Sequence, residues 1–85
     1  MSASVEHYEV VKSFIVRNFY VSDASALGVD TSLGDQGIVD STGVLEVTAF
    51  LESEFGIHIN DAEITPENLD TIASIAKFVT RKQAA

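Results

Sequence analysis

The residue of this chain with the clearest capacity for chemistry is Ser41, in the stretch 39–43 (VDSTG). It lies where a polar loop gives way to an apolar segment with helical periodicity that ends at Phe55. A hydroxyl at a helix start is held toward solvent, and a phosphate ester there would lie at the positive end of the helix dipole, which favours an anion by up to about 1 kcal/mol. We therefore expect Ser41 to receive a group from another enzyme.

A second interpretation of Ser41 is purely structural, because serine is among the preferred residues at a helix N-cap. Its neighbour Asp40 is an equally good cap, so the pair supplies two candidates where one suffices. Gly43 keeps the first turn uncrowded. We expect Asp40 or Ser41 to cap the helix, and the spare candidate favours modification of the serine.

The size and composition of the chain argue against an enzyme. With 85 residues we expect one domain, residues 1–85, whose core leaves little room for a buried catalytic pocket. The absence of cysteine removes disulfides, thiolate zinc sites and intrinsic thioester chemistry, and it suits a reducing compartment. The N-terminus lacks a basic region followed by an apolar run, and no stretch is long enough to span a bilayer, so we expect a soluble, cytoplasmic protein.

The charge of the chain limits its partners. The formal net charge is −8, and the span 18–76 holds no lysine or arginine, although it contains every acidic residue except Glu6 and Glu9. Repulsion of this sign argues against nucleic acids and anionic membrane surfaces, so partners should present basic patches. A hydrophobic content of 46% places this acidity on a folded surface. We expect a monomer.

Hydrophobic periodicity predicts an all-α fold, a small four-helix bundle with a long first loop and a short third helix. The helices are expected over residues about 5–20, 41–55, 65–69 and 71–82. Gly56 should end the second helix, Pro66 marks the start of the third, and Asp70 should cap the fourth.

The first loop, residues 21–40, is long for a compact domain, so we expect it to pack on the core and to contain a short helical turn. The turn-forming residues of this stretch, Gly34 and Gly37 among them, interrupt any helical period. The apolar residues that could pin the loop to the core are Leu27, Val29, Leu33 and Ile38.

The second helix should have one apolar and one small, acidic face. At 100° per residue the inward stripe consists of Val44, Val47, Leu51 and Phe55. The opposite stripe consists of Thr42, Glu46, Ala49 and Ser53, with Glu52 and Glu54 on its flanks. Short side chains around an anion suit close approach by a basic partner helix.

The register of residues around Ser41 resembles that of acyl carrier protein and peptidyl carrier protein domains. The matching positions are Asp40, Ser41, Glu46, Leu51, Phe55, Ile59, Asn60 and Asp61, followed by the stripe Ile72, Ile75 and Val79. The resemblance extends over nearly the whole chain. Thr42, Gly43 and Ala49 depart from the residues common in the family.

The resemblance implies that Ser41 receives a 4'-phosphopantetheine arm from coenzyme A through a phosphopantetheinyl transferase. The thiol of the arm would supply the thioester chemistry that a chain without cysteine lacks. The resemblance places Asp40 near the transferase and its metal, and no metal site is expected in the chain itself. The implied partner-binding residues are Asp40, Thr42, Glu46, Ala49, Glu52 and Glu54.

On this basis we expect a free-standing, non-catalytic carrier of acyl or aminoacyl thioesters. Its partners would be the transferase, a loading ligase or acyltransferase, and downstream acyl-processing enzymes with basic docking patches. Fatty acid, polyketide and nonribosomal peptide biosynthesis all remain open, because the loading enzyme chooses the cargo.

Two alternatives come from other classes of protein. An acidic interaction module without a prosthetic group, an inhibitor or charge mimic, would use the same acidic face and be indifferent to Ser41. A serine hydrolase would need a partner such as His58, but the chain has no nucleophile elbow or evident oxyanion loop, so His58 is expected to be a surface residue between two core isoleucines. Residues 30–35 lack the ligand pattern of an EF-hand calcium loop.

Overall fold

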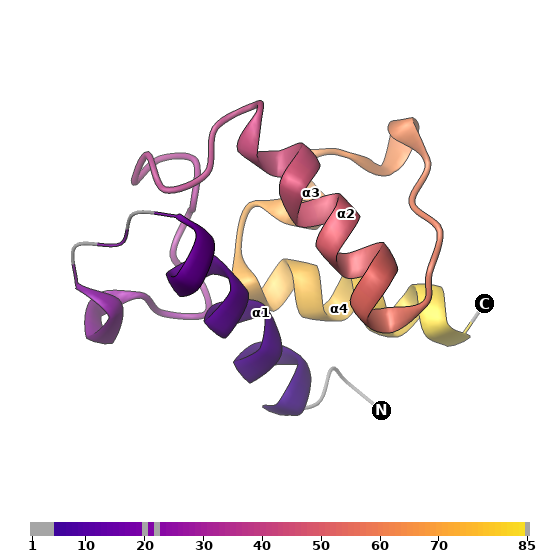
Figure 1. The fold of residues 1–85 in the computed structure, drawn as a ribbon, viewed down its shortest axis with the longest axis horizontal. Helices are drawn as coiled ribbons and strands as arrows, with labels where there is room; N and C mark the ends of the chain where they lie inside the picture. The colour runs from indigo at the N-terminus through magenta and orange to yellow at the C-terminus, as the bar shows by residue number, and fades with distance from the viewer. Residues whose placement is uncertain (1–4, 20, 22, 85) are drawn as a thin grey trace.

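The computed structural model describes residues 5–19, 21 and 23–84, and every regular element in them is helical. The α-helices are α1 (Val5–Asn18), α2 (Gly43–Phe55), α3 (Pro66–Leu69) and α4 (Ile72–Ala84). Two 3-10 turns, η1 (Ala24–Ala26) and η2 (Asp61–Glu63), lie in the connections. The predicted all-α bundle, with its long first loop and short third helix, is confirmed (Figure 1).

The helices begin and end near the expected positions, with two informative shifts. Helix α1 ends at Asn18, whose side-chain amide donates to the carbonyl of Phe14 at 3.0 Å, and the expected last residue, Tyr20, lies outside the described residues. Helix α2 begins at Gly43 and not at Ser41. The later start of α2 leaves both residues of the Asp40-Ser41 pair in the turn that precedes the helix.

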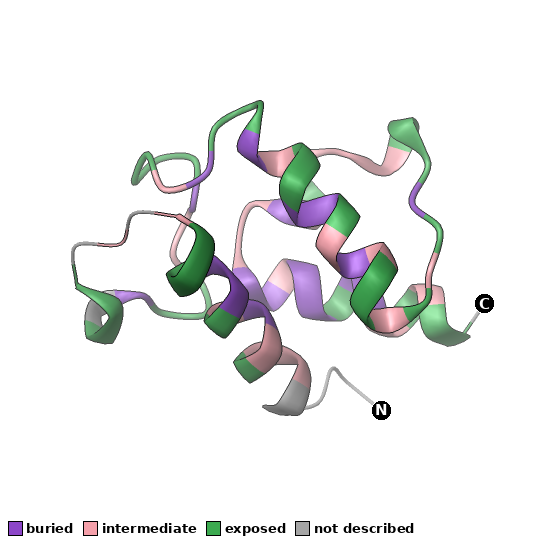
Figure 2. Cartoon of the chain, viewed as in Figure 1, coloured by how far each residue is buried: buried purple, intermediate pink, exposed green. Residues whose placement is uncertain are grey.

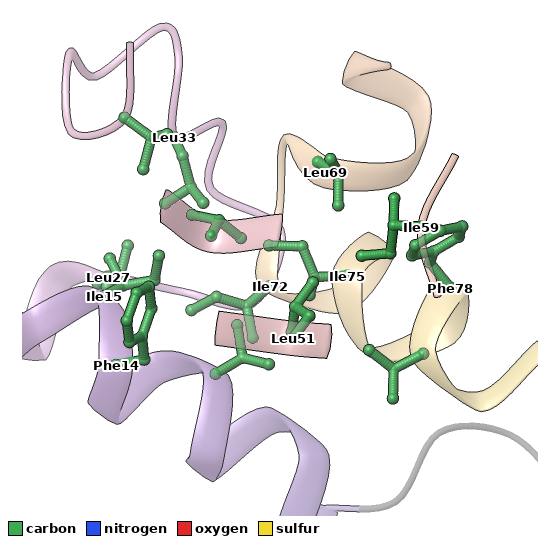
Figure 3. Close-up of a cluster of buried hydrophobic side chains, with 14 residues drawn as sticks. Phe14, Ile15, Leu27, Leu33, Leu51, Ile59, Leu69, Ile72, Ile75 and Phe78 are labelled. Atoms are coloured by element: carbon green, nitrogen blue, oxygen red, sulfur yellow. The ribbon is translucent and has the colours of Figure 1, made fainter. Parts of the chain in front are cut away.

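The core is built around α4, in which Ile72, Ala73, Ile75, Ala76, Phe78 and Val79 are buried (Figure 2). Side chains from all four α-helices, from the first loop and from the segment after α2 converge on it (Figure 3). The apolar side chains with at most 1% exposure are Val11, Ile15, Leu33, Val47, Leu51, Ile72, Ile75, Ala76, Phe78 and Val79. One core therefore fixes α2, which carries the site, relative to α3 and the loop.

The first loop is packed on the bundle, as the sequence predicts, and it contains the short turn η1. Leu27 and Leu33 are buried and Ile38 packs against the core, whereas the Val29 side chain is 39% exposed. Val29 contributes through its backbone instead, because its carbonyl accepts the N–H of Ala73 in the first turn of α4 at 2.8 Å.

Asp70 does not cap α4, so that expectation is wrong. Thr71 takes the role, since its hydroxyl accepts the N–H of Ser74 at 2.9 Å. The Asp70 carboxylate instead accepts the N–H of Gly34 at 3.0 Å and the hydroxyl of Ser32 at 2.5 Å. Asp70 thus ties the first loop to the junction of α3 and α4.

The segment after α2 is ordered by local polar contacts. Gly56 ends α2 as predicted, with a φ of 65° in the left-handed region that glycine tolerates. The turn η2 was not expected, although the spacing of Asn60 and Glu63 is that of a capping box, in which each side chain accepts the other residue's backbone N–H. The Glu63 carboxylate also accepts from the ammonium of Lys82 at 2.9 Å, which anchors η2 to α4.

Among the described residues, no helix has both the length and the apolar character required to cross a membrane.

Candidate functional site

Ser41 lies in the turn that leads into α2, and its side chain is exposed. The turn is already helical in its hydrogen bonding, because the N–H of Val44 donates to the carbonyl of Asp40 at 2.9 Å. Within residues 5–19, 21 and 23–84, no group is hydrogen-bonded to the Ser41 hydroxyl. The hydroxyl is therefore available to another molecule.

Asp40 performs the capping that either residue of the pair could have provided. Its Oδ1 accepts the N–H of Gly43 at 2.6 Å, three residues further on, which is the geometry of an N-cap. Thr42, immediately before the helix, makes no side-chain capping bond. Because the Asp40 carboxylate caps the helix, the Ser41 hydroxyl is not needed as a cap.

A pocket of about 240 Å³ opens beside Ser41, between the start of α2, α3 and the first loop. Its apolar lining consists of Leu33, Val39, Val44, Ile64, Pro66 and Leu69. Its polar lining consists of Gly34, Asp40, Ser41, Thr65 and Asp70. A mostly apolar pocket at the foot of a modifiable hydroxyl can contact a flexible group attached there.

The outer face of α2 is exposed as the sequence predicts. The exposed residues among those expected to bind partners are Asp40, Thr42, Glu46, Ala49 and Glu54. Leu45 was missed: it is 56% exposed and lies on the same face, between Thr42 and Ala49. The sequence could have predicted this exposure, because a leucine outside the inward stripe and beside an acidic residue has to point to solvent.

Glu52 differs from the other acidic residues of α2. Its carboxylate accepts the backbone N–H of Ile59 at 2.9 Å, and Nδ1 of His58 lies 3.5 Å from the same oxygen. The sequence places Glu52 on the flank of the partner face, but the structure gives its carboxylate an internal partner. It holds the segment after α2 against the end of that helix.

His58 is a surface residue, as expected, with 82% of its side chain exposed. It lies in the segment after α2 and does not line the pocket beside Ser41. Ile59 is buried and Ile57 packs against the core, so His58, between these two isoleucines, points outward. The structure therefore brings no histidine base to Ser41 from this position.

The far side of the pocket is held by charged contacts. The backbone N–H of Asn60, and after it the ammonium of Lys82, hold the pKa of the Glu63 carboxyl below its ordinary value. The Asn68 side chain donates to the carbonyl of Glu63 at 2.9 Å and accepts from Arg81 at 3.0 Å. These contacts join η2, α3 and α4, and so they position the α3 residues that line the pocket.

A family profile described as "Phosphopantetheine attachment site" matches residues 9–79. The chain belongs to the phosphopantetheine-binding carrier family. It is similar to a D-alanyl carrier protein of Abiotrophia defectiva, with 33% identity over 57 residues, which are 67% of this chain and 72% of the relative. The family resemblance of the sequence is confirmed, and the cofactor of a carrier of this family is 4'-phosphopantetheine.

The residues around Ser41 fit this cofactor. A phosphodiester needs an exposed hydroxyl without a competing hydrogen bond, and Ser41 has both properties. A carrier also needs room for the arm at its root, which the apolar pocket beside Ser41 supplies. No group of three or more metal-ligating side chains occurs in the part of the chain that the structure describes.

Proposed function

We propose that this chain is a single carrier domain, that Ser41 bears the 4'-phosphopantetheine arm, and that the chain itself catalyses no reaction. The observation that carries the proposal is the different roles of Asp40 and Ser41 at the start of α2. Asp40 caps the helix through the N–H of Gly43, and the exposed Ser41 hydroxyl has no partner in the described residues. A carrier of this family needs one exposed hydroxyl that is not hydrogen-bonded within the protein.

The attachment step uses only the Ser41 hydroxyl of this chain. Its oxygen forms a bond to the phosphorus next to pantetheine, the pyrophosphate bond of coenzyme A breaks, and adenosine 3',5'-bisphosphate leaves. The transferase takes the hydroxyl proton. The new phosphodiester lies at the start of α2, where the helix dipole favours an anion.

The thiol of the arm supplies the thioester linkage to the cargo. The chain's own contribution is to hold the arm at one place on a rigid bundle. A tethered group reaches a docked enzyme at an effective concentration set by the tether and not by free diffusion. Apolar side chains lining the pocket, such as Val44 and Leu69, can shelter part of the arm between transfers.

We propose an acyl or aminoacyl cargo, and the similarity to a D-alanyl carrier protein favours an amino acid. The loading enzyme would then be an adenylating ligase, and acyltransferases loading a fatty acyl or polyketide group are the other class to test. The carrier delivers the thioester to enzymes that accept the same arm.

The partner-binding surface is the exposed face of α2. It is formed by Thr42, Leu45, Glu46, Ala49 and Glu54, together with Asp40 at its start. Its charge is negative, so the transferase and the loading enzyme should present basic patches. Glu52 contributes less to this surface than its sequence position suggests, because its carboxylate holds the N–H of Ile59.

The proposal is tested by incubating the purified chain with coenzyme A, magnesium and a promiscuous phosphopantetheinyl transferase. Intact-protein mass should increase by one arm for the wild type and for Ser13→Ala, a control serine exposed on α1. Ser41→Ala should gain nothing while keeping the native circular dichroism spectrum. A folded wild type that stays unmodified with several transferases contradicts the proposal.

The acidic interaction module is the remaining alternative, and family membership favours the carrier over it. The two are separated by the same Ser41→Ala variant. A partner that binds this variant as tightly as the modified wild type would support the module, because the arm would then be unnecessary.

A further inference from the structure

Gly43, the first residue of α2, is buried against the ring of Phe19. A Cβ atom at residue 43 would lie 2.7 Å from Cε1 of Phe19, and 3.4 Å from its Cζ. Real Cβ atoms essentially never approach another atom to less than 3.0 Å, so the 2.7 Å distance would force a shift. Gly43 does not have a positive φ, so its backbone does not require glycine. The residue is glycine because the Phe19 ring occupies the space of a side chain.

The Phe19 ring is held in place by the Phe14 ring and by the end of α1. Its backbone N–H donates to the carbonyl of Ile15 at 3.0 Å, just past the helix end. Its ring meets the Phe14 ring edge-on, with 6.1 Å between centroids, and Phe14 stacks on Phe50 of α2 at 4.0 Å. The aromatic contacts therefore connect α1 to α2 both at its first turn and near its middle.

The capping bond of α2 lies at the same point. The Cβ position of residue 43 is also 3.2 Å from Oδ1 of Asp40, the oxygen that accepts the N–H of Gly43 at 2.6 Å. A methyl group there would have to displace the ring, the carboxylate or the turn. The Phe19 ring and the Asp40 carboxylate thus both pack against Gly43. Ser41 lies in the turn between Asp40 and Gly43.

We propose that Phe19 and Gly43 are a positioning pair for Ser41. The ring, seated on the bare backbone of Gly43, holds the first turn of α2 and its Asp40 cap in one arrangement, which fixes where the Ser41 hydroxyl is presented to the transferase. This inference rests on the proposed function and assigns the direction of the hydroxyl to a contact from Phe19, the residue that follows α1.

Displacement of the first turn should slow arm transfer, because a misplacement of about 1 Å at a reacting group can cost up to about 100-fold in rate. Gly43→Ala crowds the ring, and we expect kcat/KM for modification to fall about tenfold. Phe19→Leu removes the ring and leaves the turn unsupported, with a smaller loss expected. In the double variant the shorter leucine leaves room for the new methyl group, so the rate should recover above that of Gly43→Ala alone.

The test compares these three variants with wild type at a temperature where all are folded, using initial rates of arm addition by intact-protein mass. Hydrogen exchange of the residue 43 amide, which reports the Asp40 cap, is measured in parallel. Phe55→Leu, at the opposite end of α2, and Gly28→Ala, where a Cβ would meet only Thr31 Oγ1 at 3.4 Å, are matched controls.

The proposal expects slow modification and faster exchange at residue 43 in Gly43→Ala, recovery in the double variant, and wild-type rates in both controls. Equal rates for wild type, Gly43→Ala and Phe19→Leu overturn it while leaving Ser41 as the attachment residue. Equal slowing in Phe55→Leu and Phe19→Leu also overturns it, because loss of stability alone would then explain the rates. A wild type that accepts no arm overturns both this inference and the proposed function.

Discussion

The two ends of α2 use their polar side chains in opposite ways. At the start, Asp40 satisfies the first turn and leaves Ser41 free beside an open pocket. At the end, Glu52 accepts the N–H of Ile59, and its own carbonyl accepts the N–H of Gly56 at 3.0 Å. The start of α2 leaves a hydroxyl exposed to other molecules, whereas the polar side chain near its end bonds to the backbone of the next segment.

This difference shows that acidity alone does not identify a partner-binding residue. Glu46, Glu52 and Glu54 all belong to one acidic helix, but only Glu52 has its carboxylate bonded to the backbone of the next segment. The proposed partner face therefore depends less on Glu52 than the run of acidic residues implies. The following substitutions test that division, beginning with the largest expected effect on stability.

Glu52→Ala should destabilise the protein by about 1 to 2 kcal/mol, because it removes a charged acceptor from the N–H of Ile59. Glu54→Ala removes the same charge two residues away and should change the free energy of unfolding by less than about 0.5 kcal/mol. Urea denaturation followed by circular dichroism measures both. Equal losses for the two variants would show that the ends of α2 do not differ in this way.

Asp40→Ala should cost about 1 kcal/mol of stability through loss of the cap to Gly43. Asp40→Asn keeps a side-chain oxygen and should retain most of the stability. The same denaturation series applies, and arm transfer should slow in the alanine variant as the turn around Ser41 loosens. An alanine variant as stable as wild type would mean that the capping bond contributes nothing.

The contacts of Glu63, in the turn η2 that follows α2, predict a smaller effect on stability that depends on pH. Its pKa is lowered from 4.5 in the folded state, so the ionised carboxylate stabilises the protein above about pH 4.5 and this contribution is lost as the pH falls through the folded pKa. Glu63→Gln should therefore be less stable than wild type at neutral pH and approach it in acid. Lys82→Met should keep part of the effect, since the N–H of Asn60 remains. A pH-independent gap between wild type and Glu63→Gln would be inconsistent with this account.

Ser41→Ala should have the smallest effect on stability, within about 0.5 kcal/mol, although it should abolish arm attachment. The hydroxyl has no partner in the described residues, so nothing in the fold depends on it. Urea midpoints of Ser41→Ala and Asp40→Ala, measured together, give the sharpest contrast within one turn. A midpoint for Ser41→Ala as low as that of Asp40→Ala would assign the serine a structural role.

The repeating apolar residues were sufficient to predict the helices. Val11 and Ile15 of α1, or Ile72 and Ile75 of α4, recur at helical spacing and are buried as expected. The contacts of Asp70 were not predictable in this way, because Ser32 and Gly34 lie far from it in the sequence. Local pattern identifies a helix, whereas the partner of a polar side chain depends on the tertiary fold.

The candidate site was predictable to a similar degree. Ser41 and the exposed face of α2 follow from the helix start and its period, and Leu45 could have been found from the same helical projection. The roles of Glu52 and Phe19 could not, since each contacts a segment that only the folded bundle brings close. The sequence predicts an uncrowded first turn at Gly43, whereas the structure buries Gly43 against the Phe19 ring.

We propose that the free hydroxyl at the start of α2 is the attachment residue. Peptide mapping of the protein purified from a host that expresses a phosphopantetheinyl transferase tests this most directly. We predict one arm, located on the peptide that contains Ser41 and absent from every other serine and threonine. An arm on another residue, or none on folded protein from such a host, would contradict it.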